Sequence, residues 1–188
     1  MVPVSCVVPA AGCSSRMGQW KPLLAFRGST IIQTVVRAAV SSCWRVIVVA
    51  GYRGEELGAL FEGETGVTVI LNADWEMGMF SSIRRGAMGV DTDRFFVVLG
   101  DKPFIEPDVY RALLGAPPAD AVFPVFGGER GHPVLLSRAV REAVLAADPQ
   151  SGSMPGIISR FTVSELAWSD DSILRDIDMP SEYDSARS

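Results

Sequence analysis

The sequence predicts an α/β fold, in which helices cover both faces of a mostly parallel sheet. Short apolar runs alternate with segments of helical spacing from residue 4 to residue 114. The runs are apolar throughout, which is typical of parallel strands buried on both faces. A chain of 188 residues has the size of one domain. We expect residues 4–183 to form a single domain and 184–188 to be a tail.

The first strand is expected at Val4–Val8, where every residue except one serine is apolar or cysteine. Apolar residues then recur at helical spacing over Thr30–Val40, and Ser29 or Thr30 can cap this helix. The run RVIVVA at Arg45–Ala50 predicts a second buried strand.

Three more units continue the alternation. Gly54–Phe61 is a short amphipathic segment, and Val67–Leu71 is a third apolar run. Ser81–Met88 fits a helix that one of its first two serines opens. Phe95–Leu99 is the fourth strand, and Pro107–Leu114 follows as a helix with proline in its first turn.

The pattern changes after residue 115. Ala121–Val125 and His132–Leu136 are expected to be strands on either side of a glycine-rich turn. Arg138–Ala147 predicts a helix, Met154–Arg160 a weaker helix, and Phe161–Ala167 a last strand. No repeat or inter-domain linker is evident.

Composition excludes several classes of protein. The net charge of −5 argues against a general nucleic-acid or anionic-membrane surface. Three cysteines without a CxxC pair argue against a disulfide framework and a zinc site. Cys13 is either a reactive thiol or a small filler. The N-terminus lacks the pattern of a signal peptide, and no apolar run is long enough to span a membrane. We therefore expect a cytoplasmic protein.

Ligands of parallel α/β sheets bind beyond the carboxyl ends of the strands. This rule indicates the segments Ala10–Lys21, Gly51–Arg53, Asn72–Ser82 and Gly100–Pro103.

The first of these segments, AAGCSSRMGQWK, is either an ordinary turn or a loop that cradles phosphate. Small residues at Ala10, Ala11 and Gly12 let a ligand approach backbone N–H groups, and Arg16 and Lys21 can neutralise a polyphosphate. The spacing is neither a Walker A motif nor GxGxxG, so an NAD-binding protein is disfavoured.

Carboxylates follow two other segments. Asp101 comes directly after the fourth apolar run, and Asp176 and Asp178 share one face of an extended DIDMP segment. Asp101 with one of these two is a plausible Mg²⁺ clamp, and a capping or surface role is the alternative. Lys102 is either a phosphate partner or a solvated lysine.

Two further stretches carry polar groups. In NADWEMGMFSSI, Gly78 permits close approach, Ser82 can hydrogen-bond a base or ribose, and Trp75 either stacks on a ligand or packs. His132, the only histidine, can contact a phosphate, carry a proton or stabilise a turn.

Taken together, these stretches resemble the molybdenum cofactor nucleotidyltransferases, the MobA-like NTP transferase family. AAGCSSRMGQWKPLL resembles the family signature AAGxSxRMGxxKxLL, and GYRGEEL, NADWEMGMFSSI, LGDKPFI, GHPVLLS and DIDMP resemble further blocks. The match covers residues 4–183. Ala10–Ala11–Gly12 is similar to the cytidylyltransferase branch, whereas the guanylyltransferase branch has AGG. Ser151–Arg160 departs from the family's GDxGAR-like block, and no site residue is assigned there.

The resemblance implies a three-layer Rossmann-like (GT-A-like) nucleotidyltransferase that transfers CMP from CTP to the terminal phosphate of molybdopterin and releases pyrophosphate. By the same resemblance, Lys21 contacts the α-phosphate and Arg16 the β- and γ-phosphates, while Asp101 and Asp178 hold Mg²⁺. The resemblance also implies nucleotide-binding roles for Ala10, Ala11, Gly12, Gly78 and Ser82. His132 would face the pterin.

Two alternatives remain open from the sequence. One is a guanylyl- or other nucleotidyltransferase of the same family. The other is a non-catalytic carrier of molybdenum cofactor for a molybdenum hydroxylase, with which transient contact is expected in either case.

Overall fold

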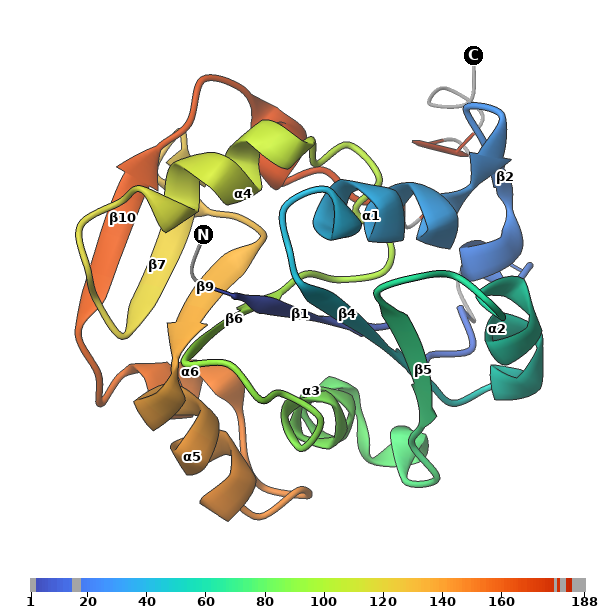
Figure 1. Ribbon diagram of the computed structural model, residues 1–188, viewed down its shortest axis with the longest axis horizontal. Helices are drawn as coiled ribbons and strands as arrows, with labels where there is room; N and C mark the ends of the chain where they lie inside the picture. The colour runs from blue at the N-terminus through green and yellow to red at the C-terminus, as the bar shows by residue number, and fades with distance from the viewer. Residues whose placement is uncertain (1–2, 15–17, 178, 180–181, 184–188) are drawn as a thin grey trace.

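The computed structural model describes residues 3–14, 18–177, 179 and 182–183, and it confirms the predicted α/β class (Figure 1). Its centre is an eight-stranded sheet. In order across the sheet, the strands are β10 (Val163–Ala167), β7 (Ala121–Phe126), β9 (Val134–Ser137), β6 (Arg94–Val97), β1 (Ser5–Pro9), β4 (Arg45–Ala50) and β5 (Val67–Leu71), with β8 (Glu129–Arg130) paired to β7.

The sheet is mostly parallel, as the apolar runs predicted. β1 runs parallel to both β4 and β6, β4 to β5, and β10 to β7. The exceptions are β9, which runs antiparallel to both of its neighbours, β6 and β7, and the short β8, which runs antiparallel to β7. Val134, at the start of β9, pairs with Val97 at the end of β6. The residues that precede β9 therefore lie at the same edge as the residues that follow β1, β4 and β6, and we call it the carboxyl edge.

Helices cover both faces of the sheet, as expected from strands without alternation (Figure 1). One face carries α1 (Ile31–Val40), α2 (Gly54–Leu60) and α4 (Pro107–Leu114), and the other carries α3 (Met79–Ala87), α5 (Arg138–Ala146) and α6 (Met154–Ile158). Alternate residues of β1 serve the two cores: Cys6 and Val8 pack with α1, and Val7 packs with α3. The result is the three-layer arrangement.

Short elements complete the chain. A small hairpin, β2 (Ala25–Phe26) with β3 (Ser29–Thr30), precedes α1. The 3₁₀ turns η2 (Lys21–Leu23), η3 (Trp75–Met77) and η4 (Asp171–Ile173) were not predicted from the sequence.

The starts of two helices show how local chemistry sets the boundaries. Thr30, rather than Ser29, caps α1, because its hydroxyl accepts from the N–H of Gln33 at 3.2 Å and the Gln33 side chain accepts in return. The predicted start of α3 at Ser81 or Ser82 is wrong. The helix begins at Met79, after Gly78, whose φ of +100° favours glycine.

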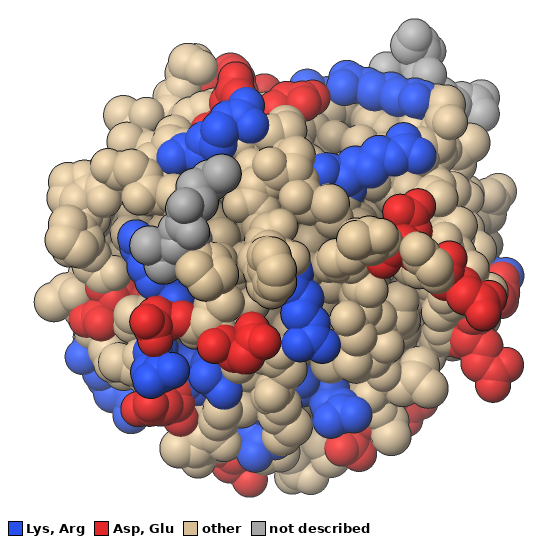
Figure 2. Space-filling view, viewed as in Figure 1, with Lys and Arg blue, Asp and Glu red and all other residues tan. Residues whose placement is uncertain are grey.

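Charge is distributed without a dominant basic field. Among the described residues on the face in Figure 2, acidic and basic side chains are interspersed, unlike the continuous basic surface of a nucleic-acid-binding domain. In the part of the chain that the structure describes, no helix has the length and apolar character needed to cross a bilayer.

Candidate active site

The loops at the carboxyl edge enclose a cleft of about 360 Å³. Strand-like hydrogen bonds extend into these loops: the N–H of Ala10 donates to Val49 at 2.9 Å, and that of Gly100 donates to Pro9 at 3.1 Å. The structure brings most of the predicted nucleotide site into this one cleft. The predicted residues that line it are Ala10, Ala11, Gly12, Lys21, Gly78, Ser82 and Asp101.

The loop after β1 presents backbone N–H groups to the cleft. Within the described residues, the amides of Ala11 and Gly12 donate to no protein acceptor. A Cβ added at Gly12 would meet no atom within 4 Å, so the fold itself does not require glycine there. Cys13 continues the loop as an exposed free thiol that also lines the cleft. Open amides beside a glycine are the arrangement that binds phosphate oxygens.

Lys21 and Asp101 form an ion pair inside the cleft. The Nζ atom of Lys21 lies 3.2 Å from Oδ2 of Asp101, and the two side chains are 12% and 29% exposed. Lys21 begins η2, and its backbone N–H donates to the hydroxyl of Ser14 at 3.2 Å. The loop is further fixed by Trp20, whose indole N–H donates to the carbonyl of Gly12 at 3.2 Å.

Asp101 has the free oxygen that a hard cation needs. Its Oδ1 atom is buried and makes no hydrogen bond within the described residues. A carboxylate oxygen without a partner fits Mg²⁺ or Mn²⁺, which prefer oxygen ligands and keep water and substrate phosphates in their shell. No cluster of three or more metal-ligating side chains occurs among the residues that the structure describes. The predicted residues Arg16 and Asp178 lie outside the described residues.

Polar and aromatic side chains shape the opposite wall of the cleft. Ser82 is buried, and its hydroxyl accepts from Nδ2 of Asn72 at 3.1 Å, while Ser81 accepts from the same nitrogen at 3.0 Å. These serines therefore join α3 to the end of β5 instead of capping the helix. Ser82 also faces the cleft, so its hydroxyl hydrogen can reach a ligand.

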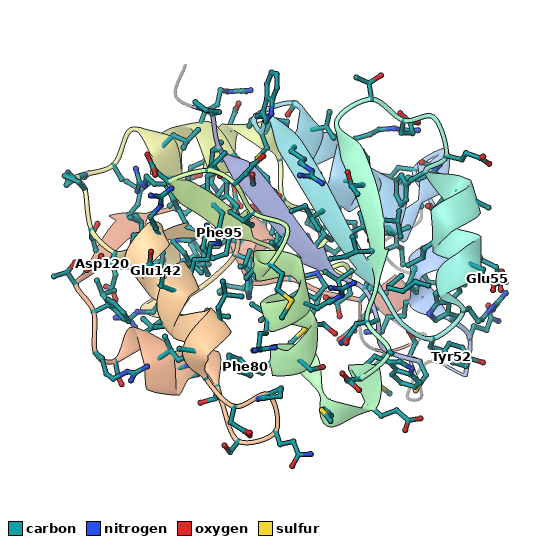
Figure 3. All side chains as sticks on the ribbon, turned by 60° about the horizontal axis from the view of Figure 1, so that its bottom comes forward. Tyr52, Glu55, Phe80, Phe95, Asp120 and Glu142 are labelled. Carbon is teal, nitrogen blue, oxygen red and sulfur yellow. The ribbon has the colours of Figure 1, made fainter. Side chains whose placement is uncertain are left out.

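An aromatic set holds three of the edge loops together. Tyr52 lies with its ring centroid 6.1 Å from that of Trp20 and 6.1 Å from that of Trp75. Trp75 packs so closely on Gly51 that a Cβ there would lie 2.6 Å from the tryptophan Cβ. Tyr52 itself is visible at the margin of the molecule beyond the sheet (Figure 3). Trp75 thus packs on protein and also lines the cleft.

A second cleft of about 760 Å³ lies beside the first and shares Met79 and Leu99 with it. Its lining is mainly apolar. Phe80 projects from α3 into the space between α3 and α5 (Figure 3). Most residues that line this cleft were not predicted from the sequence, among them Phe80, Phe123, Phe161, Ser153, Met154 and Ile158. The apolar residues of Ser151–Arg160 could have indicated a binding surface, but no site residue was assigned there.

His132 lines the second cleft. Burial lowers its pKa to about 4, and the hydrogen bond with the Val97 carbonyl, 3.3 Å from Nδ1, opposes this shift only in part. The ring is therefore neutral at pH 7. With its proton on Nδ1 donated to Val97, Nε2 is left as a hydrogen-bond acceptor. At pH 7 the ring therefore offers a ligand hydrogen bonds rather than a charge.

Lys102 follows neither of its predicted alternatives. Its side chain is only 7% exposed, so it is not solvated. Its Nζ atom donates to the carbonyl of Leu174 at 2.6 Å and lies 3.7 Å from Oδ2 of Asp176. Lys102 is occupied by the C-terminal part of the chain rather than by a phosphate.

The chain is similar to known proteins over most of its length. The family model described as "MobA-like NTP transferase domain" matches residues 6–163. The chain is 31% identical over 188 residues to the molybdenum cofactor cytidylyltransferase of Escherichia coli, covering 100% of this chain and 97% of that protein.

Solved structures show the same fold. A nucleotidyl transferase from Methanothermobacter thermautotroptrophicus superposes with a TM-score of 0.84 at 23% identity, over 98% of this chain and 96% of that one. The Mycobacterium tuberculosis protein Rv0371C, solved in complex with manganese, superposes with a TM-score of 0.77 at 22% identity, over 99% and 98% of the two chains.

Proposed function

The chain belongs to the MobA-like NTP transferase family and is a nucleotidyltransferase of molybdenum cofactor biosynthesis, and from this premise we propose the substrates and the role of each site residue. The proposed reaction transfers CMP from CTP to the terminal phosphate of molybdopterin, giving molybdopterin cytosine dinucleotide and pyrophosphate. The observation that carries the proposal is the Lys21–Asp101 pair in a cleft beside the open amides of Ala11 and Gly12.

The donor nucleotide occupies the first cleft in this proposal. The amides of Ala11 and Gly12 donate to phosphate oxygens, Lys21 contacts the α-phosphate, and Arg16 contacts the β- and γ-phosphates. The ribose and base lie near Gly78 and Ser82. A phosphate monoester is already nucleophilic, so the chain needs no strong general base. Its contribution is to orient the two substrates and to offset charge that develops at the α-phosphate.

We assign the divalent cation to Asp101 and Asp178. When bound, Mg²⁺ offsets phosphate charge and makes pyrophosphate a better leaving group. The partnerless Oδ1 of Asp101 supports this assignment, while its Oδ2 keeps the Lys21 ammonium in place. In this assignment Asp101 would hold the cation with one oxygen while the other stays paired with the lysine.

The second cleft is proposed to bind the pterin of the acceptor. Its apolar lining suits a flat heterocycle, and neutral His132 offers Nε2 as an acceptor for a pterin N–H. Met79 and Leu99 belong to both clefts, so an acceptor phosphate that extends past them enters the nucleotide cleft. This arrangement supports an in-line approach between two adjacent substrates.

Two measurements test the proposal. Thermal shifts with each NTP and Mg²⁺ rank the nucleotides, and we expect the largest stabilisation from CTP. Pyrophosphate release from CTP is then measured with molybdopterin, with GTP as the matched comparison. A larger effect of GTP in both assays would refute the cytidine preference and leave a guanylyltransferase of the same family.

Absence of pyrophosphate release, with tight binding of molybdenum cofactor, would instead support a carrier. The proposed product is used by a molybdenum hydroxylase, and a transient contact with such an enzyme belongs to the proposal. We also place the protein in the cytoplasm, a reducing compartment that suits its three free cysteines.

A further inference from the structure

A segment near the C-terminus crosses the carboxyl edge and joins both clefts. We call residues 173–177 the C-terminal strap. Its first residue, Ile173, accepts from the N–H of His132 at 3.0 Å, and its last, Ile177, donates to the carbonyl of Asp101 at 3.1 Å. Both isoleucine side chains are fully buried. The strap is therefore tied to the acceptor side at one end and to Asp101 at the other.

Lys102 fixes the middle of the strap. Its ammonium donates to the carbonyl of Leu174 at 2.6 Å and lies 3.7 Å from the carboxylate of Asp176. The lysine side chain is 7% exposed, whereas that of Asp176 is 42% exposed. Burying an ammonium is costly unless it is paired and hydrogen-bonded, and among the described residues Lys102 meets both conditions through the strap.

Packing does not require this lysine. An apolar side chain of the same length would fill the space without the desolvation cost, and replacing buried ion pairs by apolar groups is often neutral or stabilising. The charge stands next to Asp101 in the sequence and makes its contacts with a segment 72 residues away. Since Asp176 offsets the Lys102 charge, the charge of Asp101 remains available to Lys21 and to a cation.

We propose that Lys102 is a positioning residue for the divalent-cation site: by clamping the strap, whose last residue Ile177 hydrogen-bonds the Asp101 carbonyl, it holds Asp101 in place. This inference rests on the cation role given to Asp101 and Asp178 above. Lys102 touches neither substrate nor cation. It acts as the outer hydrogen-bonding partners of metal ligands do, whose loss typically weakens metal affinity by about 10- to 100-fold.

The first test measures Mn²⁺ affinity by electron paramagnetic resonance, on the full-length protein with a non-hydrolysable CTP analogue. We expect Lys102→Met to weaken Mn²⁺ binding by about tenfold. Affinity for the analogue in EDTA should stay within about twofold, because the phosphate-binding amides and Lys21 are untouched. Arg111→Met, which removes an exposed arginine that pairs with Asp108, is the matched control and should change neither value. Unchanged Mn²⁺ affinity in folded Lys102→Met would overturn the proposal.

The second test follows the strap itself, without ligand. Arg175 lies in the strap with its guanidinium 3.9 Å from the centre of the Phe104 ring. Loosening the strap should expose the bond after Arg175 to trypsin, and we expect cleavage there to be about tenfold faster in Lys102→Met. The Lys102 bond itself precedes a proline and is a poor trypsin site.

Asp176→Asn covers the case in which Lys102→Met fails to fold. Its carboxylate is 42% exposed, so folding should survive, and we expect about threefold weaker Mn²⁺ binding. Cleavage after Arg175 is not compared in this variant, because residue 176 belongs to the trypsin site. Unchanged Mn²⁺ affinity would overturn the proposal. If wild-type protein binds no Mn²⁺ with the analogue, the proposed function fails instead, and the cleavage rates still decide whether Lys102 clamps the strap.

Discussion

Replacing Asp101 by asparagine separates two roles of one side chain. The substitution keeps the shape and removes the charge. It takes a ligand oxygen from the proposed cation site and removes the negative charge that lies 3.2 Å from the Lys21 ammonium. Metal-dependent turnover and metal-free nucleotide binding should therefore change in opposite directions.

The distance between Lys21 and Asp101 sets the size of the expected electrostatic effect. Two unit charges 3.2 Å apart attract by about 5 kcal/mol at an effective dielectric constant of 20. The carboxylate is 29% exposed, so water screens part of this, and we take about 3 kcal/mol as the electrostatic effect of Asp101 on its surroundings. If the Asp101 charge acts on a cation in the transition state with a strength of this order, its removal lowers kcat by roughly 100-fold, within the range known for preorganised electrostatic groups.

Metal-free CTP binding should become tighter. Asp101 repels phosphate and partly neutralises Lys21, so its removal favours an anionic ligand when no cation is present. We expect the dissociation constant of CTP in EDTA to fall by about threefold, a modest effect because screening by solvent is strong.

Two assays check these values: pyrophosphate release with Mg²⁺ and calorimetric titration with CTP in EDTA. Asp108→Asn is the control, since that carboxylate is 73% exposed on α4 and pairs only with Arg111. Near-normal turnover in Asp101→Asn would remove Asp101 from the mechanism. Weaker CTP binding in EDTA would refute the idea that Asp101 and Lys21 balance each other in the cleft.

Three further predictions concern the loop, the acceptor side and the core. Gly12→Ala should weaken CTP binding by about tenfold without changing Tm, as isothermal titration and thermal melting would show. The added Cβ meets no atom of the described residues, so only a bound phosphate is displaced. The pKa of His132 is about 4 in the folded protein and 6.5 in an unfolded chain. Between pH 6.5 and pH 4 the unfolded chain therefore binds a proton that the folded protein does not, so the free energy of unfolding decreases as the pH falls through this range. The loss is about 3 kcal/mol, and His132→Gln should lack it in urea titrations at pH 7 and pH 4. Gly86→Ala would place a Cβ 2.3 Å from Val7, and urea unfolding should show a loss of about 2 kcal/mol; full stability would mean that α3 can move away from the sheet.

The fold was predictable where a short apolar run stands between turns. Arg45–Ala50 and Val67–Leu71 were predicted with the bounds that the structure gives, although only the first is buried and the second is a partly exposed edge strand. The start of α3 was wrong because its serines bond Asn72, nine and ten residues away, and a glycine opens the helix instead. Local sequence carries no signal for a side chain that turns inward.

Of the site residues, too, some could be predicted from the sequence and others could not. The loop after β1 and Asp101 were found because each follows a strand at the carboxyl edge. The partner of Lys102 was not found, since Leu174 approaches only after the strap has folded across the edge. Most of the second cleft escaped prediction because apolar residues such as Phe123 and Phe161 resemble ordinary core until the space beside them is known.

The reversed direction of β9 has a consequence for how such an enzyme can diverge. Because β9 enters the sheet against its neighbours, His132 and the β7–β8 hairpin belong to chain that follows the loops of the first cleft in sequence. The first cleft is lined by residues from 9–14, 21–22, 75–82 and 99–101, whereas most of the lining of the second cleft comes from residues 123–163. Under the proposed assignment of the two clefts, insertions or substitutions in the later segment can change the acceptor while the donor loops stay intact. Selection can therefore redesign one half of the reaction without losing the other.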